Sequence, residues 1–322
     1  MLDFTDYVFS LSSTSWPAAV AAVQGLLIVA VIRTLYLVLY RLCLSPLAGF
    51  PGPRLAAATH WYEAYFDLAS QGGGQWTFKI RELYQKYGPI IRINPDELHI
   101  DDPDYYDVIF CNSHASRPID KIETFRYRFG VPEATVQTAS AEVHRRRRAA
   151  VAPCFSKARI RSRNEDLQAI IDRISQRLSA EYAGTGNVVN VNDLWSAMAS
   201  DIITAMAFAR PTNYAAATDF KSPFAQATGK MIHFAHIMTH FRFLATALRW
   251  LPDTFLAYLA PDEMRHQIQE ILDGSNKDIT HAAHPTIFHD AHSADLPPED
   301  MTLRRLQEEA VGINGGAVET TS

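Results

Sequence analysis

Two stretches of the chain combine residue types that could perform chemistry. The first is HRRRRAAV, in which His144 and Arg148 stand four residues apart. On a helix this spacing puts both side chains on one face, where they could hold an anionic group between them. Arginine suits that task because its guanidinium can grip a carboxylate with two charge-assisted hydrogen bonds. The alternative is a solvated basic face, as charge runs on helices usually are, and we expect Arg145, Arg146 and Arg147 to lie on the surface.

The second stretch is GGAVETTS, at residues 315–322. It continues an apolar helical face formed by Leu303, Leu306, Ala310, Ile313 and Ala317. Gly315 and Gly316 each cost a helix about 1 kcal/mol relative to alanine, so we expect another group to approach the backbone closely there. The alternative is a helix that ends at the glycines. The helical spacing of the following AVETT favours a helix that continues through them.

The pattern around these stretches predicts a mainly α fold with a small β-sheet near its start. An amphipathic helix is expected over residues 76–87, and two short strands over 90–93 and 98–100. Asp102 followed by Pro103 marks a helix start. Beyond Ala139 the pattern is mainly helical, with loops expected at residues 183–187, 210–213 and 282–298.

The N-terminal segment, residues 1–45, has the character of a membrane anchor. From Trp16 to Tyr40 the chain is almost continuously apolar, which matches the ~20 residues that a bilayer-spanning helix needs. A cleaved signal peptide and a buried core helix are the alternatives. Arg33, Arg41 and Arg54 lie within or after the run, so the remaining domain, residues 46–322, is expected on the cytoplasmic side of a single-pass anchor. Prolines at 46, 51 and 53 predict a stiff linker between the two.

Composition excludes several classes of function. A formal net charge of -5 and a pI near 6.2 give no basic excess for a polyanion, so no nucleic-acid partner is expected. His233, His236 and His240 stand at helical spacings that could bind a metal. Phenylalanines surround them and no carboxylate accompanies them, so we interpret that stretch as an apolar face and expect no metal site formed by side chains of this chain.

Four short motifs occur in a characteristic order behind the anchor: PLAGFPGPRLAAAT, YGPIIRINPDELHI with DPDYYDVIF, HRRRRAAVAPCFS and GGAVETT. In this order, over nearly the whole chain, they resemble membrane-anchored fungal cytochrome P-450 monooxygenases, above all those that oxygenate terpenoids and related secondary metabolites. The resemblance implies a haem cofactor, an apolar small-molecule substrate, an NADPH-dependent cytochrome P-450 reductase as partner, and the endoplasmic reticulum membrane as location.

The resemblance also implies roles for single residues. His144 and Arg148 match the pair that binds the haem propionates in this family. Gly316 and Ala317 match the small residues that leave room for dioxygen. Glu319 and Thr320 match the acid and the hydroxyl that relay protons as the O–O bond breaks.

The chain departs from the family pattern in two respects. The family holds its iron with a cysteine thiolate in a glycine-rich loop, and none of Cys43, Cys111 and Cys154 lies in such a loop. The Glu-x-x-Arg helix of the family is also absent. We therefore expect the N-terminal part of a cytochrome P-450 fold, truncated inside the oxygen-binding helix and inactive alone. The alternative is a non-catalytic membrane-tethered binding or scaffold protein derived from that family.

Overall fold

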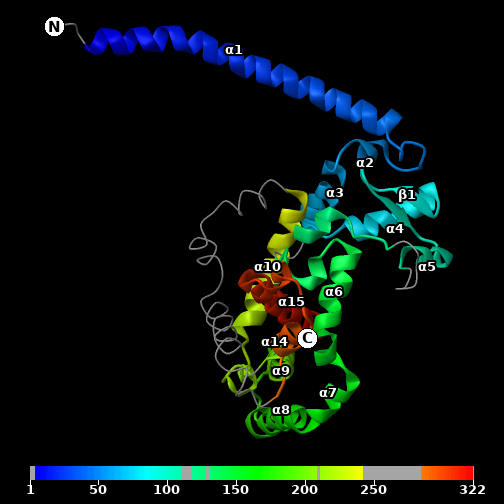
Figure 1. Cartoon of the computed structure of the whole chain (residues 1–322), viewed down its shortest axis with the longest axis vertical. Helices are drawn as coiled ribbons and strands as arrows, with labels where there is room; N and C mark the ends of the chain where they lie inside the picture. The colour runs from blue at the N-terminus through cyan, green and yellow to red at the C-terminus, as the bar shows by residue number, and fades with distance from the viewer. Residues whose placement is uncertain (1–3, 111–117, 128–130, 209–210, 242–283, 322) are drawn as a thin grey trace. The chain divides into compact units, whose positions relative to one another are not determined.

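A computed structural model describes residues 4–110, 118–127, 131–208, 211–241 and 284–321. The chain forms two compact units, residues 1–108 and 109–322. Helices make up most of the described chain, and its one sheet has two strands (Figure 1). The predicted mainly α fold with a small N-terminal sheet is confirmed.

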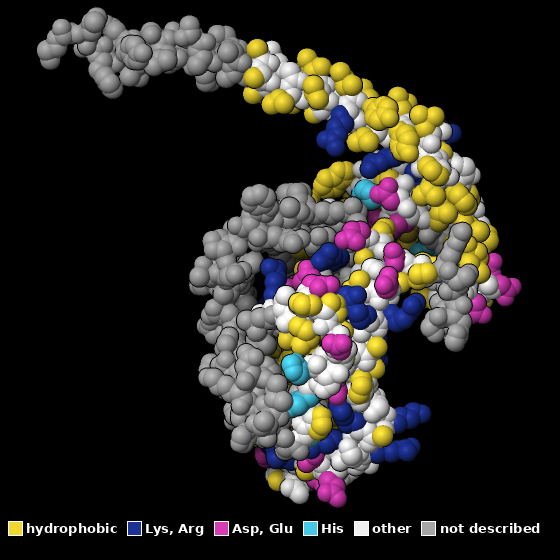
Figure 2. Space-filling model, viewed as in Figure 1, with side chains coloured by type: hydrophobic (Ala, Val, Ile, Leu, Met, Phe, Trp, Pro, Cys, Tyr) yellow, Lys and Arg dark blue, Asp and Glu magenta, His cyan; other side chains and the backbone are white. Residues whose placement is uncertain are grey.

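The first unit begins with a long apolar helix. Helix α1 (Phe4–Leu39) continues as the π-helical turn η1 (Tyr40–Leu44), so the helix starts earlier than the sequence predicted. The span Val20–Leu44 has a mean hydropathy of 2.1, and none of its most apolar window is buried. Figure 2 shows hydrophobic side chains along α1 from Val20 onward. Within the described residues this is the one helix long and apolar enough to cross a membrane.

Two arginines fix the end of this helix to the residues that follow it. The Arg41 guanidinium donates to the carbonyl oxygen of Ala58 at 2.9 Å. Arg92, 2% exposed, donates to the carbonyl oxygens of Arg41 and Pro95, both at 2.7 Å. Gly52 permits this packing, because a Cβ there would lie 2.4 Å from the Arg92 carbonyl oxygen. The proline-rich linker is therefore held at several points.

The rest of the first unit is built around the small sheet. Strands β1 (Ile90–Arg92) and β2 (Leu98–Ile100) pair antiparallel, with Ile91 opposite His99. Helix α4 (Trp76–Tyr87) packs its apolar face on β1, as the 3.6-residue period predicted. The shorter elements of this unit are α2 (Arg54–Ala58), α3 (Trp61–Ala64), η2 (Tyr65–Ala69), η3 (Ser70–Gly72), η4 (Pro103–Tyr105) and α5 (Tyr106–Ile109).

The described part of the second unit is helical. Its longer helices are α6 (Ala141–Val151), α7 (Lys157–Ser162), α8 (Asn164–Arg177), α9 (Val191–Ala207), α10 (Pro223–His240), α14 (Ile287–Ser293) and α15 (Leu303–Thr321). Its short turns are η5 (Glu123–Tyr127), η6 (Thr135–Gln137), η7 (Ala152–Phe155), η8 (Leu178–Tyr182), η9 (Tyr214–Ala216) and η10 (Pro298–Met301).

Helix α14 lies in a stretch, residues 282–298, that the sequence analysis predicted as a loop, and that prediction was wrong. Thr286 and His289 form a reciprocal capping box at its start. Ile287, Phe288 and Ala291 are buried, so one apolar face stabilises a helix of only two turns.

Helix α15 runs through both of its terminal glycines, so the alternative of a helix ending there is wrong. Its predicted apolar face is confirmed where side chains are described: Ala310 is buried, and Leu306, Ile313 and Ala317 pack on the same core. That core is completed by Cys154, Ile203, Ala207, Phe208, Ile287 and Phe288. Helices α9 and α10 lie along α15 (Figure 1).

Candidate functional site

Helix α6 presents His144 and Arg148 on one face, as their spacing predicted. The Ser140 hydroxyl caps the helix start by accepting from the Val143 amide at 3.5 Å, and η7, which contains Pro153, follows the helix end. His144 is half-buried and Arg148 is exposed. Within the described residues, neither side chain has a hydrogen-bond or ion-pair partner. Both line the same two cavities.

The neighbouring arginines differ from the prediction, which placed all three on the surface. Arg147 is 8% exposed, and its Nε donates to Asp300 at 2.7 Å. Arg146 binds the other oxygen of Asp300, also at 2.7 Å. Only Arg145 is a freely exposed side chain of these three. The prediction is wrong for Arg147 because the helix has a buried side as well as a cavity side, and a buried carboxylate neutralises the charge there.

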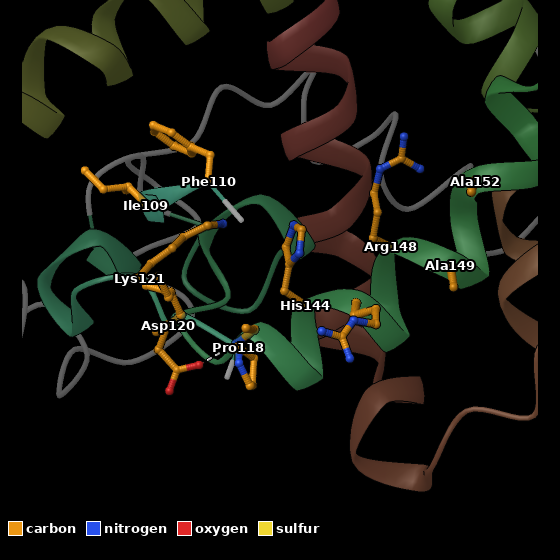
Figure 3. A pocket seen from close by; sticks show the side chains of 13 residues that line it. Ile109, Phe110, Pro118, Asp120, Lys121, His144, Arg148, Ala149 and Ala152 are labelled. Atoms are coloured by element: carbon orange, nitrogen blue, oxygen red, sulfur yellow. Dashed lines mark hydrogen bonds between the residues drawn. The ribbon is translucent and has the colours of Figure 1, made fainter. Parts of the chain in front are cut away.

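The first cavity has a volume of about 820 Å³ and a basic wall (Figure 3). His144, Arg145 and Arg148 line it from α6, and Lys121 extends its amino group from the preceding loop toward the side where His144 lies. The remaining wall is mainly apolar and includes Ile109, Phe110, Pro118, Ile119, Ala149 and Ala152. A group with an apolar body and an anionic edge matches this lining.

Among the described residues that line this cavity, the positive charges lack full compensation. Burial lowers the pKa of His144 below 6.5, and the positive charges of Lys121 and Arg148 lower it further, while Glu309 partly opposes them. Burial also lowers the pKa of Lys121. Asp120, the acid in the lining, accepts from the Ala141 amide at 2.7 Å at the start of α6. An incoming anion would therefore favour protonation of His144.

A second cavity, of about 320 Å³, lies between α6, η6 and α15. His144, Arg148, Val151 and Phe155 form its first side. A second side is formed by the η6 turn and the residue before it, through Ala134, Thr135 and Val136. Helix α15 forms the third side, through Glu309, Gly312 and Ile313. His144 and Arg148 thus lie at a junction, with the basic cavity on one side and this narrower slot on the other.

The η6 turn is held by charged side chains from three directions. Glu309 accepts from both the amide and the hydroxyl of Thr135, at 2.9 and 2.7 Å. Lys121 donates to the Val136 carbonyl oxygen at 2.8 Å. Arg147 donates to the Thr138 hydroxyl at 3.0 Å. The wall of the slot is therefore fixed by hydrogen bonds as well as by packing.

Of the α15 motif, Gly316, Ala317 and Thr320 do not line either of these two cavities. Gly316 faces open space, since a Cβ there would meet nothing within 4 Å. Ala317 packs on the core around Cys154 and Phe208. The Thr320 hydroxyl donates to the Gly316 carbonyl oxygen at 2.5 Å. Glu319 lies in α15, but its side chain lies outside the described part of the structure.

Sequence reasoning missed three residues of the site: Lys121, Glu309 and Gly312. Lys121 stands in an irregular loop, so no period connects it to α6. Glu309 follows another glutamate on a helix, and either could have been a solvated acid. Gly312 would place a Cβ 3.3 Å from the Ala134 Cβ, so its close approach resembles the one that the sequence analysis expected at the two later glycines.

The histidines of α10 and the cysteines, considered as metal ligands, do not line the two cavities where they are described. Among the described residues, no group of three or more His, Cys, Asp or Glu could hold a metal ion. His236 is exposed on α10, and the side chain of His233 lies outside the described residues. Cys43 is exposed at the end of η1, Cys154 is buried in the α15 core, and Cys111 lies outside the described ranges.

Comparison with known proteins gives a consistent family. The family model for cytochrome P450 matches residues 60–322. The chain is 37% identical over 310 residues to cytochrome P450 monooxygenase tpcC of Cochliobolus heterostrophus, covering 92% of this chain and 57% of that protein. It is 35% identical over 296 residues to cytochrome P450 monooxygenase orf4 of Eupenicillium brefeldianum, covering 89% and 57%. It is 35% identical over 318 residues to cytochrome P450 monooxygenase sdnE of Sordaria araneosa, and the match covers 93% of this chain and 60% of that protein. The chain thus spans under two thirds of the length of these relatives.

Proposed function

Because the chain belongs to the cytochrome P450 family, we propose that it forms part of a haem-thiolate monooxygenase that inserts one oxygen atom of O2 into an apolar natural product, such as a terpenoid. The observation that supports this most strongly is the junction at α6. His144 and Arg148 lack partners among the described residues and line both an apolar-walled cavity and a narrower slot.

The residues present fit the carboxylate edge of a haem. Arg148 and Lys121 offer positive charges to a cavity whose other walls are mainly apolar, and His144 offers an imidazole that a bound carboxylate would help to protonate. Cationic donors of this kind form strong charge-assisted hydrogen bonds with carboxylates. We infer that His144 and Arg148 hold the two propionates and that Lys121 contributes a further positive charge.

When bound, the haem supplies the activation of dioxygen and the oxygen-atom transfer. The chain's own residues bind and orient it and manage protons. The Thr320 hydroxyl donates a hydrogen bond to the Gly316 carbonyl oxygen in this structure. We propose that Thr320 passes a proton toward the site where dioxygen binds, that Glu319 replenishes it from solvent, and that Gly316 and Ala317 keep the nearby space free of bulky side chains.

We further propose that these 322 residues do not supply the axial thiolate and are inactive alone. Cys154 is fully buried, and burial raises the pKa of its thiol, which disfavours the thiolate that a metal ligand requires. Cys43 stands at the end of the anchor helix. The reduced chain under carbon monoxide should therefore lack the red-shifted Soret band that a thiolate-ligated haem gives. A clear band of that kind would contradict this part of the proposal.

The proposed setting is the endoplasmic reticulum membrane, with α1 as a single-pass anchor and the remaining chain in the cytoplasm. The apolar span Val20–Leu44 supports this placement. A membrane-bound NADPH-dependent cytochrome P450 reductase is the proposed electron donor.

Haem-carboxylate recognition can be tested with the full chain in lipid nanodiscs. The probes are haemin and haemin dimethyl ester, which lacks free carboxylates, each titrated against empty nanodiscs as background. We expect the chain to bind haemin more tightly than the ester. His144→Ala and Arg148→Ala should each weaken haemin binding by about ten-fold, because each removes a charge-assisted hydrogen bond, and should leave the ester within two-fold, about 0.4 kcal/mol.

The matched control is Arg161→Ala, which removes an exposed arginine from α7 that lines neither cavity. It should change neither affinity. Equal affinities of the unmodified chain for haemin and its ester would contradict the proposed carboxylate site and favour a non-catalytic protein that keeps the fold alone.

A further inference from the structure

The slot between α6, η6 and α15 contains a carboxylate where its charge is unexpected. Glu309 is 4% exposed and, among the described residues that line the slot, is the one acid. His144 and Arg148 line the same slot. An acid beside the two side chains that are to receive a carboxylate would compete with that carboxylate, so its presence calls for another role.

The hydrogen bonds of Glu309 indicate that role. A single oxygen, Oε2, accepts from the Thr135 amide at 2.9 Å, from the Thr135 hydroxyl at 2.7 Å and from Nη2 of Arg305 at 3.0 Å. Thr135 is 4% exposed and Arg305 is 1% exposed. The carboxylate therefore joins the η6 turn to α15 in a buried setting, where such bonds are strong.

Gly312, one turn further along α15, allows the η6 turn to pack closely against the helix. A Cβ at Gly312 would lie 3.3 Å from the Ala134 Cβ and 3.7 Å from Cγ1 of Val136. The hydrogen bonds between Thr135 and Glu309 hold the η6 turn against α15, and Gly312 leaves room for this close contact. Together they set the position of the slot wall that faces His144 and Arg148.

We propose that Glu309 is a positioning residue for the cofactor site, acting through Thr135 to fix the η6 wall opposite the cationic face of α6. This rests on the proposed function, since the slot matters only if the group held by His144 and Arg148 extends along it.

A purely electrostatic role and a positioning role for Glu309 predict opposite changes in haemin affinity when Glu309 is replaced by a neutral residue. If Glu309 acts only through its charge, Glu309→Gln removes a competing carboxylate, so haemin should bind more tightly and its dimethyl ester should be unaffected. If Glu309 positions the wall, the looser turn should weaken both probes by a similar factor, because the ester needs the same space.

The experiment titrates haemin and haemin dimethyl ester into the full chain in nanodiscs. For Glu309→Gln we expect both affinities to fall by about ten-fold, which corresponds to about 1.4 kcal/mol. The matched control is Glu308→Gln. Glu308 accepts from the Glu133 amide at 2.6 Å and pairs with Arg304, but it does not line the slot. This control should leave both affinities within two-fold.

Two further readouts separate positioning from a general loss of stability. The Thr135 amide should exchange with solvent at least ten-fold faster in Glu309→Gln and not in Glu308→Gln. By NMR, the pKa of His144 should fall in Glu309→Gln only. His144 faces Lys121, Arg148 and Glu309, and Glu309 is the one of the three whose charge raises that pKa.

If Glu309→Gln does not fold, Thr135→Val replaces it. That variant keeps the pair between Glu309 and Arg305 and removes the hydroxyl contact, and it should weaken both probes in the same direction. Unchanged affinities and unchanged Thr135 exchange, or tighter haemin binding alone, would overturn the inference. The proposed function would then still stand if the unmodified chain prefers haemin to its ester, and it fails separately if that preference is missing.

Discussion

At the scale of single residues, Asp300 shows how a run of four arginines is divided between two tasks. Asp300 is fully buried and binds Arg146 with one oxygen and Arg147 with the other. Burial alone would raise the pKa of Asp300, but the two arginines offset this and lower it below 3.8. Arg147 is thus neutralised inside the protein, while Arg148 remains available to a ligand.

Replacement of Asp300 by asparagine should destabilise the second unit. Arg147 would keep its position with an uncompensated buried charge, which typically costs about 3–5 kcal/mol. Chemical denaturation followed by circular dichroism measures this loss. Arg145→Ala, on the exposed side of the same helix, is the control and should change the free energy of unfolding by less than about 0.5 kcal/mol. A neutral Asp300→Asn result would show that Arg147 finds another partner.

The lowered pKa of His144 predicts how stability and binding depend on pH. The unfolded chain takes up a proton near pH 6.5 and the folded chain only at lower pH, so the free energy of unfolding should decrease as pH falls below about 6.5. A bound carboxylate reverses this preference and raises the pKa of His144, so haemin should bind more tightly at pH 6 than at pH 8. Both slopes should diminish in His144→Gln. Equal slopes in the variant would assign them to other groups.

The sequence could predict some residues of the site and not others, for a physical reason. His144 and Arg148 share one helix, so their spacing alone puts them on one face. Lys121, Thr135 and Glu309 come together only through tertiary packing of a loop, a turn and a distant helix. No periodicity along the chain encodes such a meeting.

At the scale of elements, the glycines of α15 have different surroundings. Gly312 packs against Ala134, whereas Gly316 borders open space. The sequence analysis expected close packing at Gly315 and Gly316. That expectation is met at Gly315, where a Cβ would lie 3.4 Å from Cγ2 of Thr228, but not at Gly316, and a slightly closer approach lies one turn earlier at Gly312.

This difference gives opposite expectations for two substitutions. Gly312→Val should destabilise the second unit by about 1–3 kcal/mol, because the added side chain would overpack the contact with Ala134 and Val136. Gly316→Ala should stabilise α15 by about 0.5–1 kcal/mol, because the new methyl group meets nothing within 4 Å and alanine favours the helix. Thermal unfolding of the two variants in parallel measures both. Equal effects would mean that the η6 contact does not constrain the helix.

Elements with a strong local pattern were predicted well. Helix α4 has the predicted bounds, and β2 does too, while β1 ends one residue earlier than expected. Helix α14 was missed because its seven residues include two histidines, an aspartate and a serine. Its stability comes from three buried side chains and a capping box, which local composition does not reveal.

At the scale of the whole molecule, the long apolar helix α1 leads to a prediction about the location of the chain. None of the residues in its most apolar window is buried. We expect the full chain to stay in the membrane pellet after carbonate extraction, and a variant lacking residues 4–44 to be released or to aggregate. Protease added to intact microsomes should digest residues 46–322, because the arginines after α1 favour the cytoplasmic side. Release of the full chain by carbonate would contradict the anchor.

The hydrogen bond from Arg92 to the Arg41 carbonyl oxygen also restricts motion at the C-terminal end of the α1–η1 helix. A folded unit that is joined to a membrane helix by a flexible linker can rotate independently of the helix. Here the carbonyl oxygen at the end of the helix is itself a hydrogen-bond partner of the unit's buried arginine, and Arg41 reaches back to Ala58. If α1 is inserted in a membrane as proposed, these two hydrogen bonds would couple rotation of its C-terminal end to the residues around Ala58 and Arg92.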